Sequence, residues 1–425
     1  MKRSTFKTLL ASVILGTALL TGCSTSGFNK APELFVNPFT YNAFSNSVYD
    51  SAGMALKYKP FVYTGKTLVK IEYKNKSNIE YFLNKDMDVW SVSKKYVIGK
   101  VPPDLLSEIK ANYTYQMISP KEGMTIQFRL DKGYSTYQSM TTKLKQVATQ
   151  YSNLATLTDI GDSWEKTQGK ADRDIWAMHI TGKSSGTKPA VLFMGNHHAR
   201  EVVTVELPML LINHLLENYG KDKEVTDLVD NRDIWIIPMV NPDGHIKVEQ
   251  GRDWRKNTDT SSGGNGVDLN RNYGYKWGTS GTSHSPNNDT YCGKSAFSEP
   301  ETQAIRNFED AHKNIKASIS WHSFANTVMW PWSYAGTTAP DSVKLSEIGT
   351  QMASFSGYEP EQSSDMYPSS GDTDDWGYSQ HKIFGYTIEV GTWNDGFDPP
   401  YSSMPKFWKE NLPMCMYLLK TAGNL

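Results

Sequence analysis

The sequence predicts an α/β fold built on a mixed, mostly parallel, twisted sheet that is flanked by helices. From about residue 134 onward, short apolar segments alternate with segments of helical periodicity, as they do in α/β proteins. The apolar segments are continuous runs, which is typical of strands buried on both faces of a sheet. A smaller β-rich region precedes this part of the chain.

The elements of the main sheet follow one another in regular order. Five apolar segments are the expected strands: DIWAMHI (174–180), VLFMGN (191–196), DIWIIPMV (233–240), KASISWHSF (316–324) and GYTIEVG (385–391). TYQSMTTKLKQVATQY (136–151) and VELPMLLINHLLENYG (205–220) have helical spacing, and Gly220 ends the second. We therefore assign residues 131–425 to one α/β domain.

Residues 46–130 form the β-rich region. KTLVKIEYK (66–74) places Val69, Ile71 and Tyr73 on one face, and MTIQFRL (124–130) alternates in the same way. No catalytic constellation is visible there. The residues leave two alternatives open, a small packed domain or an inhibitory pro-segment.

The first 22 residues are typical of a signal peptide. A positively charged start precedes the twelve-residue apolar segment 9–20, which is shorter than the roughly 20 residues that cross a bilayer. LTGC (20–23) resembles a bacterial lipobox, in which the cysteine becomes the acylated first residue. We expect Cys23 to carry a lipid anchor and residues 23–45 to be a tether, although plain secretion is the alternative. The residue after Cys23 is Ser24 rather than an aspartate, which favours the outer membrane of the cell envelope.

Charge and cysteine content exclude two classes of protein. Lys and Arg number 44 against 45 Asp and Glu, so the net charge is −1. This balance gives no electrostatic reason to expect a nucleic-acid partner. Three cysteines are too few for a disulfide scaffold, and whether Cys292 and Cys415 pair is open.

Polar residues gather directly after the expected strand 191–196. His198 and Glu201 are three residues apart, so a helical turn would bring both to one face, where one metal ion could bind them. Zinc hydrolases commonly use three protein ligands and leave the remaining position to water. His322 ends a later strand and is the expected third ligand, because sites in α/β folds gather at the carboxyl ends of strands. His197 would point elsewhere and is assigned no role.

Seven motifs follow in order across residues 195–390: GNHHARE, NPDG, RDWRK, GVDLNRNY, SAFSEPE, SWHS and TIEV. Over about 134–425, this series resembles the zinc carboxypeptidases, the family of pancreatic carboxypeptidases A and B and of bacterial carboxypeptidase T. The resemblance implies the zinc carboxypeptidase fold, one Zn²⁺ per chain and peptide substrates with a free C-terminus. We expect a monomer.

The resemblance also implies roles for single residues. His198, Glu201 and His322 match the zinc ligands, and Asp268 matches the carboxylate that holds the first histidine. Glu389 matches the general base. Arg255 matches the oxyanion stabiliser, a role that suits a side chain that is never deprotonated.

Further matches concern the substrate. Arg200 matches an arginine of the substrate channel, Asn270 and Arg271 the pair that grips the terminal carboxylate, and Tyr367 the tyrosine that closes over it. The expected pocket for the terminal side chain comprises Met329, Ser333, Asp365, Asp372, Asp374 and Thr387. Its aspartates predict a preference for C-terminal Lys or Arg with tolerance of apolar residues. Alternatively, some of them serve the turns of YPSSGDTDDW.

Two other functions are compatible with the same residues. A lipoprotein could use this site to trim peptidoglycan stem peptides. A binding module without catalysis is the third possibility, and it is disfavoured because none of the expected ligands, Arg255 or Glu389 is missing.

Overall fold

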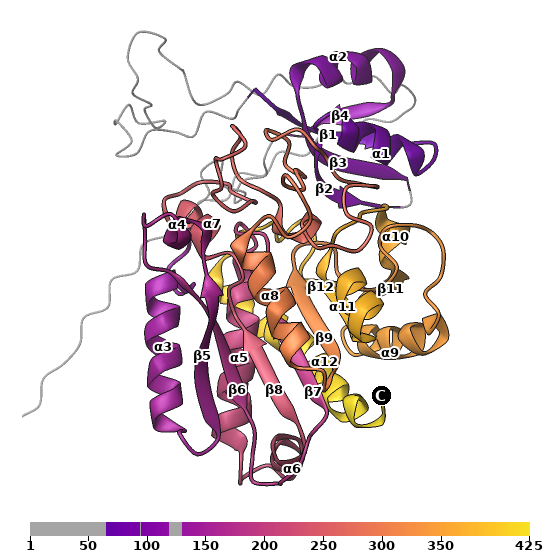
Figure 1. The fold of residues 1–425 in the computed structure, drawn as a ribbon. Helices are drawn as coiled ribbons and strands as arrows, with labels where there is room; N and C mark the ends of the chain where they lie inside the picture. Colours follow the sequence, from indigo (N-terminus) through magenta and orange to yellow (C-terminus); the bar gives the residue numbers. More distant parts are fainter. Residues whose placement is uncertain (1–64, 94, 119–129) are drawn as a thin grey trace, which may run out of the picture. The chain divides into compact units, whose positions relative to one another are not determined.

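The computed structural model describes residues 65–93, 95–118 and 130–425 (Figure 1). The expected signal peptide, Cys23, the tether and all but the last residue of the segment 124–130 lie outside these residues. Within the described ranges, no helix combines the length and the hydrophobicity that crossing a membrane requires.

The N-terminal described region contains a four-stranded antiparallel sheet in the order β2-β3-β1-β4. Val69 and Ile71 are fully buried on one face of β1, which confirms the predicted alternation. Two helices, which the alternation did not predict, pack Ile79 and Phe82 into the same core. The elements are β1 (Thr67–Glu72), α1 (Ser77–Asn84), β2 (Asp88–Val92), β3 (Tyr96–Val101), α2 (Pro103–Asn112) and β4 (Tyr115–Met117).

The main sheet has eight strands in the order β11-β10-β12-β9-β7-β8-β6-β5. The pairs β11-β10, β12-β9, β9-β7 and β7-β8 are parallel, and the other three are antiparallel. The predicted mixed, mostly parallel sheet is thus confirmed. Its strands are β5 (Ala155–Asp162), β6 (Asp174–Ile180), β7 (Ala190–Met194), β8 (Asp233–Ile237), β9 (Ile315–His322), β10 (Thr327–Trp330), β11 (Glu359–Gln362) and β12 (Phe384–Glu389).

Helices cover both faces of this sheet, and β7 shows why its sequence is apolar throughout. Val191 and Phe193 pack into one core with α5, while Leu192 and Met194 pack into the other with α8. The helices are α3 (Tyr137–Gln150), α4 (Trp164–Thr167), α5 (Val203–Asn218), α6 (Lys223–Asn231), α7 (Pro242–Glu249), α8 (Pro300–Ala311), α9 (Ser342–Ser354), α10 (Ser363–Met366), α11 (Thr373–His381) and α12 (Met404–Thr421), with 3₁₀ turns at Leu269–Arg271, Tyr401–Ser403 and Ala422–Asn424.

The carboxyl ends of three neighbouring strands bring the polar motifs together. The last residue of β12, Glu389, pairs with the last residue of β9, His322. The chain leaves β7 through Gly195, where a Cβ atom would lie 1.9 Å from the Thr204 carbonyl oxygen, so only glycine fits. This close turn directs the following residues across the end of the sheet.

Candidate metal centre

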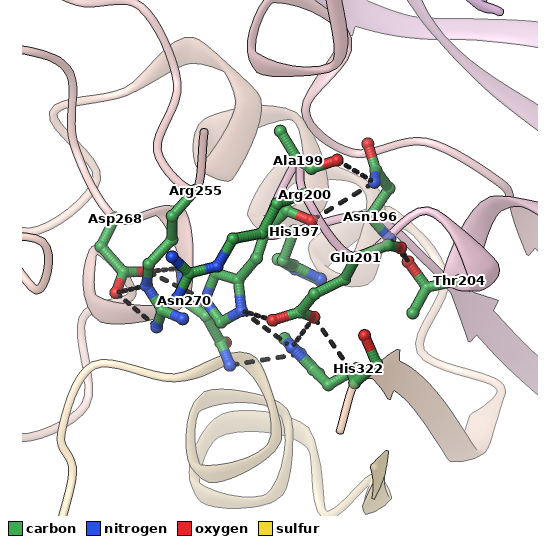
Figure 2. Close-up of polar contacts among 12 residues, drawn as sticks. Asn196, His197, Ala199, Arg200, Glu201, Thr204, Arg255, Asp268, Asn270 and His322 are labelled. Atoms are coloured by element: carbon green, nitrogen blue, oxygen red, sulfur yellow. Dashed lines mark hydrogen bonds and ion pairs between the residues drawn. The ribbon is translucent and has the colours of Figure 1, made fainter. Parts of the chain in front are cut away.

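The three expected ligands converge at the end of the sheet, and Figure 2 shows two of them, Glu201 and His322, side by side. Nδ1 of His198 lies 2.8 Å from Oε1 of Glu201 and 3.1 Å from Nδ1 of His322, which in turn lies 3.1 Å from Oε2 of Glu201. All three side chains are buried. Two imidazole nitrogens so close together need a proton or a cation between them, because both otherwise present lone pairs. Two nitrogens and a carboxylate are a donor set that zinc accepts, so the residues fit the metal.

The charge of Glu201 supports a cation at this position. Burial alone would raise the pKa of this carboxyl, but the imidazoles of His198 and His322 hold it below its ordinary value. The side chain therefore remains an anion inside the protein. A buried carboxylate beside two imidazoles is a donor set that a metal ion can bind.

Asp268 lies behind the first ligand, as expected. Its Oδ1 is 3.1 Å from Nε2 of His198, and its Oδ2 accepts hydrogen bonds of 3.0 and 2.8 Å from Nε and Nη2 of Arg255. Because Nε2 is engaged in this way, Nδ1 of His198 is left for the metal. Burial opposes ionisation of Asp268, yet Arg255 holds its pKa well below the usual range.

Arg255 and Glu389 line the same cavity as the ligands. Burial, and then the charge of the nearby Glu201, raise the pKa of Glu389 to about 8. Burial also opposes the charge of Arg255, but Asp268 raises its pKa above the ordinary value, so the guanidinium stays protonated. A carboxylate with raised basicity and a fixed cation thus face one space.

The expected clamp for a terminal carboxylate lies on the next wall of the cavity. Nη1 of Arg271 donates to the Asn270 carbonyl at 2.7 Å and Nε donates to the Gly281 carbonyl at 3.3 Å, which fixes the guanidinium plane. The Asn270 side chain accepts from the Thr373 amide at 3.1 Å. Tyr367 lines the cavity and also packs against the core of the N-terminal region.

Four of the six expected specificity residues line this cavity: Met329, Ser333, Asp372 and Thr387. Asp374 lies behind them, where its Oδ2 accepts from the Thr387 hydroxyl at 2.7 Å. Burial, and then the charge of Asp372, raise the pKa of Asp374 to about 8. Asp365 is not brought to the pocket, because its side chain is 60% exposed and pairs with Lys76 at 3.2 Å.

Arg200 is also placed differently from the expectation, because it does not line the cavity. Its Nη1 and Nη2 each donate to a carboxylate oxygen of Asp88 at 2.8 Å, and its guanidinium lies over the Phe397 ring. Burial opposes ionisation of Asp88, but Arg200 holds its pKa below the usual range. No pattern in the sequence indicated this pair, since its members are 112 residues apart. Residues 89–92, which follow Asp88 in β2, line the cavity and were likewise missed.

The two described cysteines do not pair. Cys292 and Cys415 are free and buried. The open question about their disulfide is therefore answered.

Together, the sheet and its buried His–His–Glu cluster define an α/β protein with a metal centre at the carboxyl ends of the strands. The family model described as "Zinc carboxypeptidase" matches residues 140–414. The chain belongs to this family, and the catalytic metal of the family is zinc.

Relatives agree with this assignment. A "Zinc carboxypeptidase" of Saccharothrix mutabilis subsp. capreolus is 35% identical over 292 residues, which cover 65% of this chain and 64% of the relative. "Carboxypeptidase B" of Homo sapiens is 30% identical over 298 residues, covering 67% of this chain and 70% of the relative. The crystal structure of the carboxypeptidase A from Helicoverpa armigera shares the fold, with a TM-score of 0.74, 24% identity and coverage of 85% of this chain and 98% of that chain.

Proposed function

We propose that this protein is a zinc-dependent carboxypeptidase that hydrolyses the C-terminal peptide bond of its substrates. The observation that carries the proposal is the convergence of the donor atoms of His198, Glu201 and His322 within 4.8 Å of one another. Arg255, Arg271 and Glu389 lie on the same cavity. Family membership of residues 140–414 supports the same activity.

The side chains divide the reaction among them. Zinc, held by His198, Glu201 and His322, would supply Lewis acidity and lower the pKa of water. Glu389 accepts a proton from the attacking water and delivers it to the leaving amine. Arg255 stabilises the negative charge that develops on the carbonyl oxygen, and its ion pair with Asp268 holds it in place.

Exopeptidase action follows from Arg271. A planar guanidinium binds a carboxylate through two parallel hydrogen bonds, and only the last residue of a peptide offers a free α-carboxylate. Asn270, which is adjacent, adds an amide to the same wall of the cavity. Endoproteolysis of a long chain is therefore not expected.

Replacing Glu389 tests the reaction. Glu389→Gln should lower kcat by at least about 100-fold, because the amide cannot accept the proton, while the zinc content stays at one per chain. Glu249→Gln is the control, since Glu249 is a partly buried glutamate whose Oε1 accepts from the Tyr137 amide, outside the cavity. Unchanged kcat in Glu389→Gln would remove this residue from the reaction.

For specificity, we propose a preference for C-terminal Lys or Arg with tolerance of apolar residues. Asp372 lines the cavity and Asp374 supports Thr387 from behind, so one buried carboxyl group lines the side-chain pocket and a second lies behind its wall. A cationic side chain would offset their desolvation. Peptides ending in Arg, Leu and Glu should rank in that order of kcat/KM. Asp374→Asn should reduce the Arg-to-Leu ratio, whereas the exposed Asp365→Asn should not, and a preference for Glu would contradict the proposal.

We further propose that residues 65–117 hold the intact chain in a low-activity form. Asp88 engages both terminal nitrogens of Arg200, and residues 89–92 wall the cavity, whose volume is about 80 Å³. Ligand sites usually measure roughly 300–1,000 Å³. Cleavage by trypsin after Lys121 or Arg129 should raise kcat/KM on a short peptide.

Asp88→Asn should raise the activity of the uncleaved chain, because it weakens the pair with Arg200. Asp104→Asn, an exposed substitution in α2, is the matched control. Equal activity before and after cleavage would show that the region does not inhibit.

On sequence grounds alone, we propose an exported lipoprotein anchored through Cys23 in the outer membrane. Cys23→Ser should move the protein from the membrane fraction to the soluble fraction. Unchanged membrane retention would contradict the anchor.

A further inference from the structure

His197, the neighbour of the first metal ligand, links two groups inside the site. It is fully buried, and both of its ring nitrogens have partners. Nε2 lies 2.9 Å from the hydroxyl of Tyr273, and Nδ1 lies 3.3 Å from the hydroxyl of Ser320. The same Ser320 oxygen lies 3.1 Å from Nε2 of His322. A chain of hydrogen bonds thus runs from the third metal ligand to Tyr273.

Metal binding fixes which group donates and which group accepts in each of these hydrogen bonds. Nδ1 of His322 faces His198 and Glu201, so it must present its lone pair to the ion. The ring hydrogen then sits on Nε2 and needs an acceptor. Nδ2 of Asn270 lies 3.4 Å from this nitrogen but is itself a donor, which leaves Ser320 to accept.

The positions of the remaining hydrogens follow from which atoms of each group can donate and which can accept. The Ser320 hydroxyl accepts from His322, so its own hydrogen is free to point to Nδ1 of His197. His197 must then be neutral, with its hydrogen on Nε2 donating to Tyr273.

We propose that His197 is a positioning residue that acts through Ser320 to hold His322 in the orientation and tautomer that zinc requires. It would do for the third ligand what Asp268 does for the first. This inference rests on the proposed zinc site.

Simple core packing is the competing explanation, and it accounts for less. A buried histidine needs partners for its nitrogens in either case, but here one of the partners, Ser320, also contacts a metal ligand. An apolar side chain at position 197 would leave the Ser320 hydroxyl without its acceptor. Ser320 would then be free to rotate, and His322 would lose its fixed acceptor.

The experiment measures the zinc dissociation constant of the full-length protein by competition with a chromogenic chelator. His197→Phe and Ser320→Ala should each weaken zinc binding by about 10–100-fold, the usual effect of losing a partner of a metal ligand. His197→Asn should recover part of the loss, because its amide oxygen can accept from Ser320. The control His245→Asn removes another buried histidine, whose Nε2 lies 2.9 Å from the Ser135 carbonyl, and should leave zinc binding unchanged.

Combining the substitutions separates a relay from general damage. If His197 acts through Ser320, the double variant His197→Phe/Ser320→Ala should bind zinc no more weakly than the weaker single variant. Ser320→Ala removes one oxygen atom and keeps the test decisive should His197→Phe fail to fold. The inference would be overturned if the double variant lost zinc affinity by the product of the two single losses. It would also be overturned if a folded Ser320→Ala variant had the zinc dissociation constant of the wild type.

The two proposals fail in different ways. A wild-type protein that binds no zinc would overturn the proposed function and this inference with it. Tight zinc binding by the wild type together with unchanged constants in the variants would overturn only the role of His197.

Discussion

The carboxylate of Asp268 links the proposed metal ligands to the arginine that is proposed to stabilise the oxyanion. Its two oxygens engage different partners, the proposed metal ligand His198 and Arg255, the proposed oxyanion stabiliser. Such an arrangement fixes the position of the cation relative to the ligand cluster before substrate arrives. Preorganisation of this kind is where much of the rate enhancement of enzymes originates.

Removing the arginine should therefore affect turnover more than binding. Arg255→Ala should lower kcat by about 10²–10³-fold, because the developing oxyanion loses its charged donor. Steady-state kinetics on a peptide ending in Arg would measure kcat and KM separately. A loss confined to KM would assign Arg255 to substrate binding instead.

Asp374 should make stability depend on pH. Its pKa is raised to about 8 in the folded protein, above its ordinary value of 3.8. Between these two pH values, Asp374 keeps its proton in the folded state but loses it in the unfolded state. Stability contributed by this group is present at low pH and is lost as pH rises toward 8. Asp374→Asn should consequently raise the melting temperature more at pH 8 than at pH 5. Equal gains at both pH values in calorimetry would contradict this.

The structure brings predicted site residues together where a motif defines local geometry. His198 and Glu201 lie in one tight turn, with the Glu201 amide donating to the His198 carbonyl. Their three-residue spacing predicted a shared metal only together with the ordered motifs that follow it. Asp372 satisfies both alternatives left open, because it lines the cavity and also accepts from the Asp375 amide as the N-cap of α11. The pair Asp88–Arg200 could not be predicted, because it depends on how distant segments pack.

Among the elements, the loop that joins α7 to the 3₁₀ turn Leu269–Arg271 depends on one buried amide. Oδ1 of Asn257 accepts from the Val267 amide at 2.8 Å, and Nδ2 donates to Glu299 at 2.7 Å and to Glu301 at 3.2 Å. The loop carries Arg255 at one end and Asp268 at the other. Asn257 thus ties both ends to the start of α8.

Loss of this amide should destabilise the loop and the site together. Asn257→Ala should cost roughly 1–3 kcal/mol of unfolding free energy, because buried polar groups lose their partners. It should also lower kcat, since Arg255 and Asp268 would no longer be held in register. Urea denaturation and kinetics on the same sample test both effects, and full activity in a destabilised variant would separate the loop from catalysis.

The strands were the most predictable elements. All five predicted segments became strands, since continuous apolar runs have few alternatives in a sheet covered on both faces. α1 and α2 were missed because each is short, with 8 and 10 residues. Short strands such as β10 and β11, of four residues each, carried no periodicity that could identify them.

For the molecule as a whole, zinc should act as a cross-link between two segments that are distant in the sequence. Its ligands come from the turn after β7 and from the end of β9, two segments more than 100 residues apart in the sequence. A metal ion that binds only the folded state adds about 2.7 kcal/mol of stability when its free concentration is 100 times its dissociation constant. Chelation should therefore lower the melting temperature, and added zinc should restore it. The same treatment of Glu201→Gln should produce a much smaller shift.

The two described thiols have a practical consequence. Cys292 and Cys415 are buried, and burial raises the pKa of Cys292 to about 11, so neither should react with a maleimide under native conditions. With Cys23 replaced by serine, a cysteine introduced at the exposed Ser107 of α2 would take a single fluorophore. Such a labelled protein would report, by the release of a small dye-bearing fragment, when the N-terminal region is cut away.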